Sequence, residues 1–370
     1  MTSIKNKCKN VLNKIDFNIA KVFTKKAKKK FGKIAFIFFG GLGDGVILLP
    51  FIDKLLQYYT DKDVYLICNK TIAELCKTYT GVKHIIECEN VKNFWDKRAD
   101  LYRRLQEHYF ETAIDLNFSR SELTNGFIAK HINAKEIVGI KGDDANIINR
   151  NNVDCHYTKI IDIGNNLNEI CNHQSYLESL GINVQPDLNY LKKFVCKKEE
   201  NYIVFGVGAS LKYRQWPVNN WVMVARYILA KTDYDILVCG SRDEGEFYDL
   251  IQAELNSARL KNFCGKTSLG ELIDLLGNSR FVVANDSGPA HIASSTGVSG
   301  VVILGGGFRY RFFPHIDNLG NKTNIEVVCK ETNCFGCKWN CEKTNQYGCI
   351  KSISYIDIVN NLTERNLLSK

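Results

Sequence analysis

A short apolar strand that turns directly into a helix is the feature that most restricts how this chain of 370 residues can fold. Residues 281–291 read FVVANDSGPAH. The first four are aromatic, β-branched or small, which is typical of a strand buried in a parallel sheet. Pro289 suits the first turn of the following helix, because proline has no backbone N–H to pair. The unpaired N–H groups at such a helix start favour a bound anion.

This turn is therefore the first candidate binding site. Ser287 supplies a hydroxyl, Gly288 supplies backbone N–H groups, and Asp286 can hold a ribose or another sugar hydroxyl. We expect these three residues to bind a phosphate or a sugar nucleotide. The alternative is a capped helix, in which Asp286 and Ser287 only pair with neighbouring backbone groups.

Strands and helices alternate along most of the chain. This alternation is the pattern of βαβ units, which build a parallel sheet covered by helices on both faces. A chain of this length is too long for one compact core, so we expect two domains. The runs that read as strands are 33–39, 64–68, 83–86, 112–116, 136–139, 202–205, 234–239, 281–284 and 301–304.

The two expected domains are separated by a segment without long periodicity. We place this linker at residues 186–200, where Pro186 and several lysines interrupt the pattern. It divides an N-terminal α/β domain (32–185) from a C-terminal one (201–350). Residues 351–370 are expected to form a terminal helix.

Three further strands end in turns of small residues, where bare backbone can approach a ligand. Gly43 lies in the first of these turns, Gly208 and Ser210 lie in the second, and Gly240 lies in the third. The first turn reads GGLGDG, which is not the G-x-G-x-x-G fingerprint, so it gives little support to a standard dinucleotide site. The loop that begins at Gly240 is suited to a nucleoside base and ribose.

Two charged residues near these turns suit a transfer reaction. Asp44 stands at the start of the helix after the first turn, where it either caps the helix or acts as a general base. Arg214 is a permanent cation with a two-pronged guanidinium, which suits a diphosphate. Trp216 is expected to wall the pocket. The alternative is a solvated arginine beside a core tryptophan.

The cysteines indicate a compartment and a metal site. No secretory signal and no apolar run long enough to span a bilayer is visible, so we expect a cytoplasmic protein with its fourteen cysteines mostly reduced or bound to metal. Within the cysteine-rich loop 329–349, Cys334, Cys337, Cys341 and Cys349 are spaced to enclose a structural zinc or iron. Only one C-x-x-C pair is present, so a redox pair or plain thiols stay open. Four thiolates leave no position for a catalytic metal.

The net charge of +9 is concentrated at the N-terminus, where residues 1–33 contain eleven lysines. Between these lysines, Ile15, Ile19, Val22 and Phe23 fall at helical spacing. A basic amphipathic arm of this kind (residues 1–31) suits an anionic membrane surface. Its apolar face is equally able to pack on the protein or on a second copy. Nucleic acid is not expected as a partner, because no nucleic-acid-binding motif accompanies the charge.

Three separated motifs carry a resemblance to a known family. GGLGDGVILLP at 40–50, RQWP at 214–217 and NDSGPAH at 285–291 together resemble glycosyltransferase family 9, the heptosyltransferases of lipopolysaccharide assembly. The resemblance runs from about residue 33 to the C-terminus and leaves the basic arm outside. The loop 334–349 also resembles the iron-binding loop of the autotransporter heptosyltransferases, which modify protein.

The resemblance implies the GT-B fold, two Rossmann-like domains with a cleft between them. It implies that the N-terminal half binds the acceptor and the C-terminal half binds a nucleotide-sugar donor, typically ADP-heptose. Asp44 matches the family's proposed catalytic base, and Asp286 and His291 match its D-[TS]-G-x-x-H donor motif. Arg214 stands where many members have lysine. The fold needs no catalytic metal.

The expected function is inverting transfer of a heptose, or a related sugar, to lipopolysaccharide or another surface glycan. The enzyme would work in the cytoplasm, peripherally on the inner face of the membrane. Two alternatives stay open: a protein O-heptosyltransferase of the autotransporter-modifying type, and a nucleotide- or metal-binding protein without catalysis. The basic arm favours a lipid acceptor, and the cysteine loop favours a protein acceptor.

Overall fold

The structure, a computed structural model, describes residues 14, 16–88, 95–141, 152–164, 168–308, 310–339, 341 and 347–368. The chain forms two compact α/β units. The first unit consists of Met1–Gly41, Phe51–Asn165 and Ser175–Val184. The second unit consists of Leu42–Pro50, Asn166–Gln174 and Gln185–Lys370.

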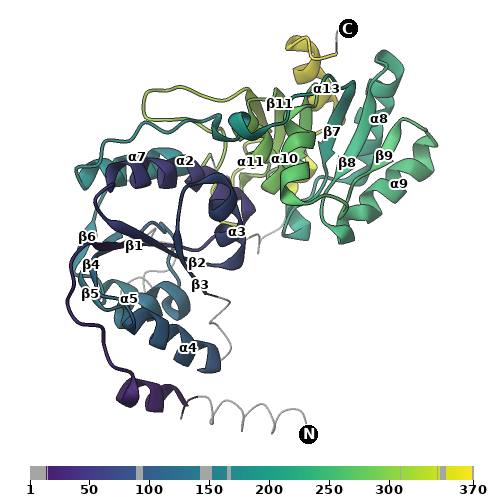
Figure 1. The fold of residues 1–370 in the computed structure, drawn as a ribbon. Helices are drawn as coiled ribbons and strands as arrows, with labels where there is room; N and C mark the ends of the chain where they lie inside the picture. Colours follow the sequence, from purple (N-terminus) through teal and green to yellow (C-terminus); the bar gives the residue numbers. More distant parts are fainter. Residues whose placement is uncertain are drawn as a thin grey trace, which may run out of the picture. The chain divides into compact units, whose positions relative to one another are not determined.

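The first unit is built on a six-stranded parallel sheet in the order β3-β2-β1-β4-β5-β6 (Figure 1). The strand order reverses between β1 and β4. Helix α3 (Lys70–Tyr79) begins at Asn69, whose side chain accepts a hydrogen bond from the Ile72 N–H, and it buries one apolar stripe. Other helices in this unit include α4 (Trp95–Gln106), the short π-helix η1 (Glu122–Gly126) and α5 (Phe127–His131). The strands are β1 (Lys33–Phe38), β2 (Asp63–Cys68), β3 (His84–Glu87), β4 (Phe110–Asp115), β5 (Ala134–Ile140) and β6 (Lys159–Ile161).

Part of the basic arm packs on this first unit. Residues 16–23 are helical, and Phe17 and Ala20 are buried in the hydrophobic core. The Phe17 ring lies 5.5 Å from the Phe127 ring and 5.8 Å from the Tyr102 ring. The packing alternative for the arm therefore holds for this side of the helix. Ile15 and most of the earlier arm lie outside the described residues.

The second unit repeats the architecture with the order β12-β11-β10-β7-β8-β9. Its order reverses between β10 and β7, and ligands of open parallel sheets bind at such a reversal, beyond the carboxyl ends of the strands. The strands are β7 (Tyr202–Gly206), β8 (Asp235–Cys239), β9 (Leu260–Asn262), β10 (Val282–Asn285), β11 (Gly300–Leu304) and β12 (Ile325–Cys329). The helices are α8 (Val218–Lys231), α9 (Gly245–Leu255), α10 (Leu269–Gly277), α11 (Gly288–Thr296), α12 (Gly348–Lys351) and α13 (Tyr355–Glu364).

Two segments from the first half of the chain belong to the second unit, although the sequence placed both in the first domain. They are the first turns of α2 (Leu42–Tyr58) and the start of α7 (Glu169–Ser179). The expected linker 186–200 is also part of the second unit. It contains the 3-10 helix η3 (Tyr190–Phe194), and the Leu191 N–H donates to Ser295 Oγ of α11 at 3.2 Å.

Candidate active site

The turn between β10 and α11 is held by a buried asparagine. The Asn285 amide nitrogen donates to the Val207 carbonyl oxygen, 2.5 Å away, and its amide oxygen accepts from the Trp216 N–H at 3.2 Å. Asn285 therefore fastens the loop after β7 to the end of β10. The Ser287 hydroxyl donates to the Asn285 carbonyl oxygen at 3.2 Å and does not cap α11. The N–H groups at the start of α11 are thus not used by this hydroxyl.

Arg214, Asp286 and His291 come together beside that turn. One Arg214 nitrogen, Nη2, forms an ion pair with Asp286 Oδ2. His291 Nε2 lies 3.6 Å from the other carboxylate oxygen, Oδ1. On its far side, His291 Nδ1 lies 2.8 Å from Nε2 of His315. The four side chains form a chain of polar groups that runs from half-buried Arg214 to a buried histidine pair.

The pKa shifts fix the charges in this chain. Burial would raise the pKa of Asp286, but the His291 ring and the Arg214 charge outweigh it, so the pKa lies below its usual value. Burial lowers the pKa of His315 well below its usual value, and His291 adds to this effect. At neutral pH Asp286 is therefore a carboxylate and His315 is neutral.

These charges also favour one hydrogen-bonding pattern. Because Asp286 is anionic, the nitrogen of His291 that faces it is best protonated, since a bare nitrogen would repel the carboxylate. His291 Nδ1 then accepts the hydrogen bond from His315 Nε2–H.

His315 was not found from the sequence, because nothing in its sequence neighbourhood marks an isolated histidine as a partner of residue 291.

The start of α2 packs directly against this chain. A Cβ atom added at Gly43 would overlap the His291 ring, and one added at Gly288 would overlap the Leu42 side chain. Glycine at both positions lets the first turns of α2 and α11 touch. Asp44 stands in that first turn of α2 and is half-buried. The general-base candidate and the donor-motif residues thus lie in one unit.

Helix α7 places a second buried charge cluster near Asp44. Arg311 forms a two-pronged pair with Glu169, with Nε 2.8 Å from Oε2 and Nη2 3.3 Å from Oε1. His173, one turn along α7, is buried. Burial lowers its pKa, while the charges of Glu169 and Asp44 act in the opposite sense. His173 is therefore close enough to Asp44 for the carboxylate charge to act on its pKa.

The other two small-residue turns meet at Glu244. Cβ atoms added at Gly208 or Gly240 would overlap its carboxylate group or approach it closely. The Ser241 N–H donates to Glu244 Oε2 at 2.6 Å, as part of a capping box. Glu244 thus occupies the space over both glycines, whereas Ser210 is exposed. The S-x-x-E spacing of 241–244 is the sequence signal that could have pointed to Glu244.

Comparison with known proteins decides the family. The model of glycosyltransferase family 9 (heptosyltransferase) matches residues 98–338. The chain belongs to this family. It is therefore a glycosyltransferase enzyme, as the three motifs predicted.

The relatives and solved structures agree with this assignment. The lipopolysaccharide core heptosyltransferase OpsX of Haemophilus influenzae is 23% identical over 295 residues, 75% of this chain and 81% of OpsX. The lipooligosaccharide heptosyltransferase 2 of the same species is 32% identical, but over only 26% of this chain and 29% of its own length. The structure of E. coli heptosyltransferase WaaC with ADP matches with a TM-score of 0.65 at 15% identity, covering 91% of this chain and 99% of WaaC. The dodecameric iron-containing heptosyltransferase TibC matches with a TM-score of 0.51 at 14% identity, covering 91% of this chain and 76% of TibC. These structural matches, together with the two parallel sheets, confirm the GT-B fold.

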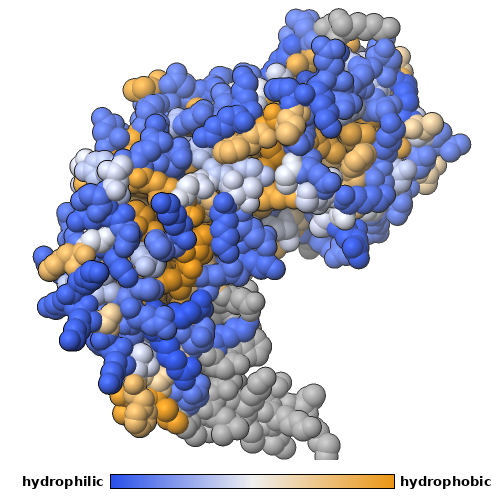
Figure 2. Space-filling view, in the orientation of Figure 1, coloured by the Kyte–Doolittle hydropathy of each residue, from blue (hydrophilic) through white to orange (hydrophobic). Residues whose placement is uncertain are grey.

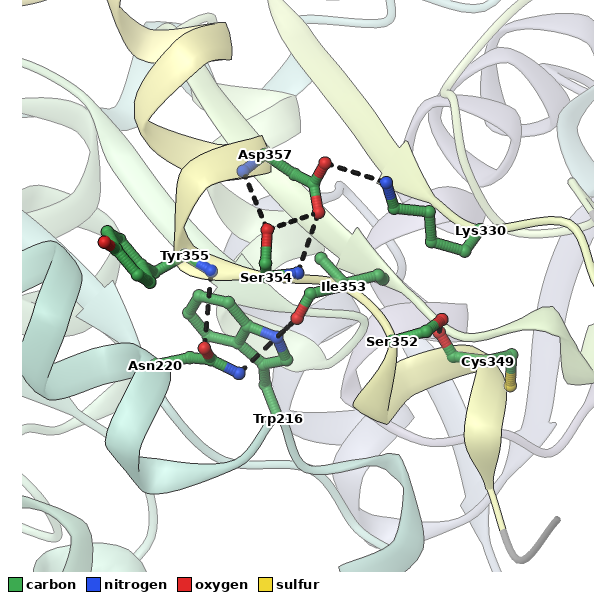
Figure 3. A network of polar contacts seen from close by, with 9 residues as sticks. All are labelled: Trp216, Asn220, Lys330, Cys349, Ser352, Ile353, Ser354, Tyr355 and Asp357. Atoms are coloured by element: carbon green, nitrogen blue, oxygen red, sulfur yellow. Dashed lines mark hydrogen bonds and ion pairs between the residues drawn. The ribbon is translucent and has the colours of Figure 1, made fainter.

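Trp216 has a structural role in this family 9 chain. It is fully buried, and its indole N–H donates to the Ile353 carbonyl oxygen at 2.8 Å. Asn220 donates to the same oxygen at 3.4 Å and accepts from the Tyr355 N–H (Figure 3). Trp216 therefore fastens the segment before α13 to the loop before α8. The expectation that it walls the pocket is wrong, because no part of the ring is exposed.

The cysteine loop is only partly assembled as a metal site. Cys337 Sγ and Cys341 Sγ lie 4.0 Å apart, close to the roughly 3.8 Å between two thiolates on a tetrahedral zinc. Cys334 is exposed and Cys349 is buried. Among the described residues, no group of three or more metal-binding side chains is gathered closely enough to hold an ion. The four-cysteine site stays a prediction.

No helix in the described ranges has the length and apolarity needed to cross a membrane.

Proposed function

We propose that this family 9 enzyme transfers a heptose, or a related sugar, from a nucleotide-diphosphate donor to a lipopolysaccharide or other surface-glycan acceptor, with inversion. The observation that carries the proposal is the direct packing of the α2 start, with Asp44, on the α11 start, with Asp286 and His291. The lipopolysaccharide core heptosyltransferase OpsX supports the sugar and the acceptor. The WaaC structures with ADP and with ADP-2-deoxy-2-fluoro heptose support ADP-heptose as the donor.

Asp44 is the general base of the proposed reaction. It takes the proton from an acceptor hydroxyl while that oxygen attacks the anomeric carbon of the donor. The bond from this carbon to the diphosphate oxygen breaks, and the nucleoside diphosphate leaves with the electron pair. Attack opposite to the leaving group inverts the anomeric configuration.

The leaving diphosphate is stabilised by groups of the second unit. Arg214, already oriented by Asp286, meets the developing negative charge together with the Ser210 hydroxyl and the N–H groups at Gly288. Each of these interactions is expected to contribute about 3 kcal/mol in the transition state. Because a cation and backbone dipoles supply this stabilisation, we expect no catalytic metal.

The nucleoside half of the donor is proposed to lie over Gly208 and Gly240. Glu244 stands there, and a carboxylate accepts hydrogen bonds from ribose hydroxyls. The capping box with Ser241 holds this carboxylate in place. The base and ribose would then sit at the carboxyl ends of β7 and β8, as the sheet topology favours.

Replacement of Asp44 tests the proposed base. Asp44→Asn should lower kcat by more than about a hundredfold, the usual size of a general-base effect, and leave ADP binding nearly intact. Asp53→Asn, on the same helix, is the matched control. Release of ADP from ADP-heptose, calorimetric ADP binding and the anomeric configuration of the product by NMR are the measurements. Near-normal turnover by Asp44→Asn removes Asp44 from the role, and a retained configuration rejects inversion.

Exposed apolar and basic side chains of the N-terminal arm, in its helix and just after it, support contact with a membrane surface. Val22, Phe23 and Phe31 are 76%, 77% and 64% exposed, and lysines at 25, 26 and 28–30 stand between them and are also exposed. Figure 2 shows hydrophobic side chains over the helix that contains residues 16–23. We propose that these three apolar side chains enter an anionic bilayer surface while the lysines contact lipid headgroups. Co-sedimentation with vesicles containing anionic lipid, but not with neutral vesicles, should be lost when Val22 and Phe23 are changed to serine.

Protein is the second candidate acceptor, and the cysteine loop favours it. The iron-containing TibC shares the fold, and we propose a structural zinc or iron held by Cys337 and Cys341 together with Cys334 and Cys349. Metal analysis of anaerobically purified protein tests this site, with about one ion per chain expected and a loss in Cys337→Ser. Incubation with labelled donor separates the acceptors, because the label enters either glycolipid or protein.

A further inference from the structure

The cysteine loop brings an aromatic side chain to the arginine of the site. The centroid of the Trp339 ring lies 5.6 Å from Arg214 Cζ, within the range of a cation–π contact. The same ring lies 5.4 Å from the ring of Tyr213, the residue before Arg214. Trp339 is only 8% exposed, so this contact is shielded from water. A shielded contact of this kind is stronger than one at the surface.

The Trp339 indole packs directly against two glycines, Gly305 and Gly307. Cβ atoms added at Gly305 or Gly307 would overlap the Trp339 ring, so larger residues would push it out. The Lys338 N–H donates to the Gly307 carbonyl oxygen at 2.6 Å. Trp339 has a φ of 64°, a backbone conformation that persists for such a residue only where the surroundings impose it. The position of this ring is therefore fixed by several independent contacts.

Arg214 needs such a contact, because Asp286 holds only one end of it. The ion pair uses Nη2, and Arg214 Nε is buried without a hydrogen-bond partner among the described residues. Trp339 Nε1 is likewise buried without a partner in that part of the chain. A guanidinium held at one nitrogen can still turn about that bond. The face of the indole removes this freedom by fixing the plane of the guanidinium.

We propose that Trp339 is a positioning residue for sugar transfer: its ring sets the plane of the Arg214 guanidinium for contact with the donor diphosphate. The inference rests on the proposed role of Arg214. It gives the cysteine loop a part in the reaction, since Cys337 and Cys341 flank Trp339 on either side. Among the contacts described above, the one between the cysteine loop and Arg214 is made by Trp339.

A double-mutant cycle between Trp339 and Arg214 tests the proposal. Trp339→Leu should lower kcat about tenfold, which lies between the effects of an exposed and a fully shielded cation–π contact, while KM for ADP-heptose changes less than about threefold. Trp339→Phe, which keeps a ring, should recover part of the loss and lower kcat only about threefold. In an Arg214→Ala background, Trp339→Leu should lower kcat by less than about twofold, because the group that it positions is gone. Phe335→Leu is the matched control, because its ring lies in the same loop but packs against Gly306 and Tyr310.

Three outcomes would overturn the proposal. They are full activity of Trp339→Leu, the same tenfold loss in the Arg214→Ala background, and an equal loss of kcat in Phe335→Leu. Normal kcat of Arg214→Ala alone would reject the role of Arg214 itself, which separates that failure from a failure of Trp339. Should Trp339→Leu not fold, the cycle is run with Trp339→Phe, with a loss of about threefold expected beside Arg214 and none beside Ala.

Discussion

Two glycines control the approach of the general-base candidate to the donor motif. Gly43 lies against the His291 ring, and Gly288 lies against Leu42. Neither position has room for a methyl group. The glycine-rich turn after β1 is thus needed for contact between two helix starts, in addition to any contact with a ligand.

Gly43→Ala should separate these helix starts. We expect a loss of about 1–3 kcal/mol in the free energy of unfolding, the usual cost of overfilling a packed site. We also expect a drop in kcat of more than about tenfold, because small displacements of reacting groups have large effects on rate. Gly81→Ala is the control, since the space around Gly81 is open. Thermal unfolding and ADP release are the measurements, and an alanine at 43 with normal activity would show that the contact is not needed.

His315 is expected to act through His291. His315→Leu removes the donor to His291 Nδ1 and should reduce kcat/KM about tenfold, in keeping with about 1–1.5 kcal/mol for one hydrogen bond. His315→Gln carries an amide N–H near the same place and should restore most of the activity. Steady-state kinetics of both variants checks this. Equal loss in the two would mean that the ring packs, and does not donate.

At the scale of the elements, the segment before α13 is fastened to the loop before α8 by the Trp216 indole, together with Asn220. Trp216 donates to Ile353, while Trp221, which is equally buried, has no hydrogen-bond partner for its indole N–H among the described residues. Trp216→Phe should therefore be more destabilising than Trp221→Phe by about 1 kcal/mol, the value of one hydrogen bond. Denaturant unfolding of both variants measures the difference. KM for the donor should stay unchanged in Trp216→Phe. A higher KM would show that Trp216 contributes to donor binding after all.

The sequence predicted the central elements well, because buried parallel strands are continuous apolar runs. The strand expected at 33–39 is β1 (Lys33–Phe38), and the one at 281–284 is β10 (Val282–Asn285). The edge strands β6, β9 and β12 were missed. LKN in β9 has no apolar pattern, whereas IEVVC in β12 has one that was not interpreted as a strand. The linker was misjudged because the burial of Tyr190 and Leu191 depends on α11, which is distant in sequence.

The candidate site was found only where its residues lie in a strand–turn–helix. Asp286 and His291 share such a motif, and Asp44 follows a glycine turn. Glu244 and Trp339 reach the site from loops whose approach depends on tertiary packing. No spacing in the sequence records that approach.

At the scale of the molecule, both units contain buried or half-buried histidines that are neutral at pH 7. Burial lowers the pKa of His131 in the first unit to about 4, and it lowers those of His173 and His315 in the second. In the unfolded chain these groups bind protons near a pH of about 6.5. Below this pH the unfolded state binds more protons than the folded state, so the free energy of unfolding falls as pH falls. Asp115, whose pKa is raised by burial, opposes the trend at lower pH.

The melting temperature should therefore fall steadily between about pH 6.5 and pH 4. His131→Phe removes one titrating group and keeps a ring among Phe17, Tyr102 and Phe127. Its melting temperature should depend less on pH over the same range. Differential scanning calorimetry from pH 7.5 to pH 4.5 is the measurement. A variant with the same slope as the natural chain would contradict the assignment for His131.

The grouping of Leu42–Pro50 with the second unit limits how the enzyme can be dissected. A recombinant fragment that starts at Gln185 would keep Arg214, Asp286 and the paired histidines, but it would lack the general-base candidate Asp44 and also Gly43, which lies against His291. Such a fragment would expose to solvent the surface around Gly288 that Leu42 normally covers. Split-protein reporters and truncation libraries should therefore be designed around a noncontiguous boundary.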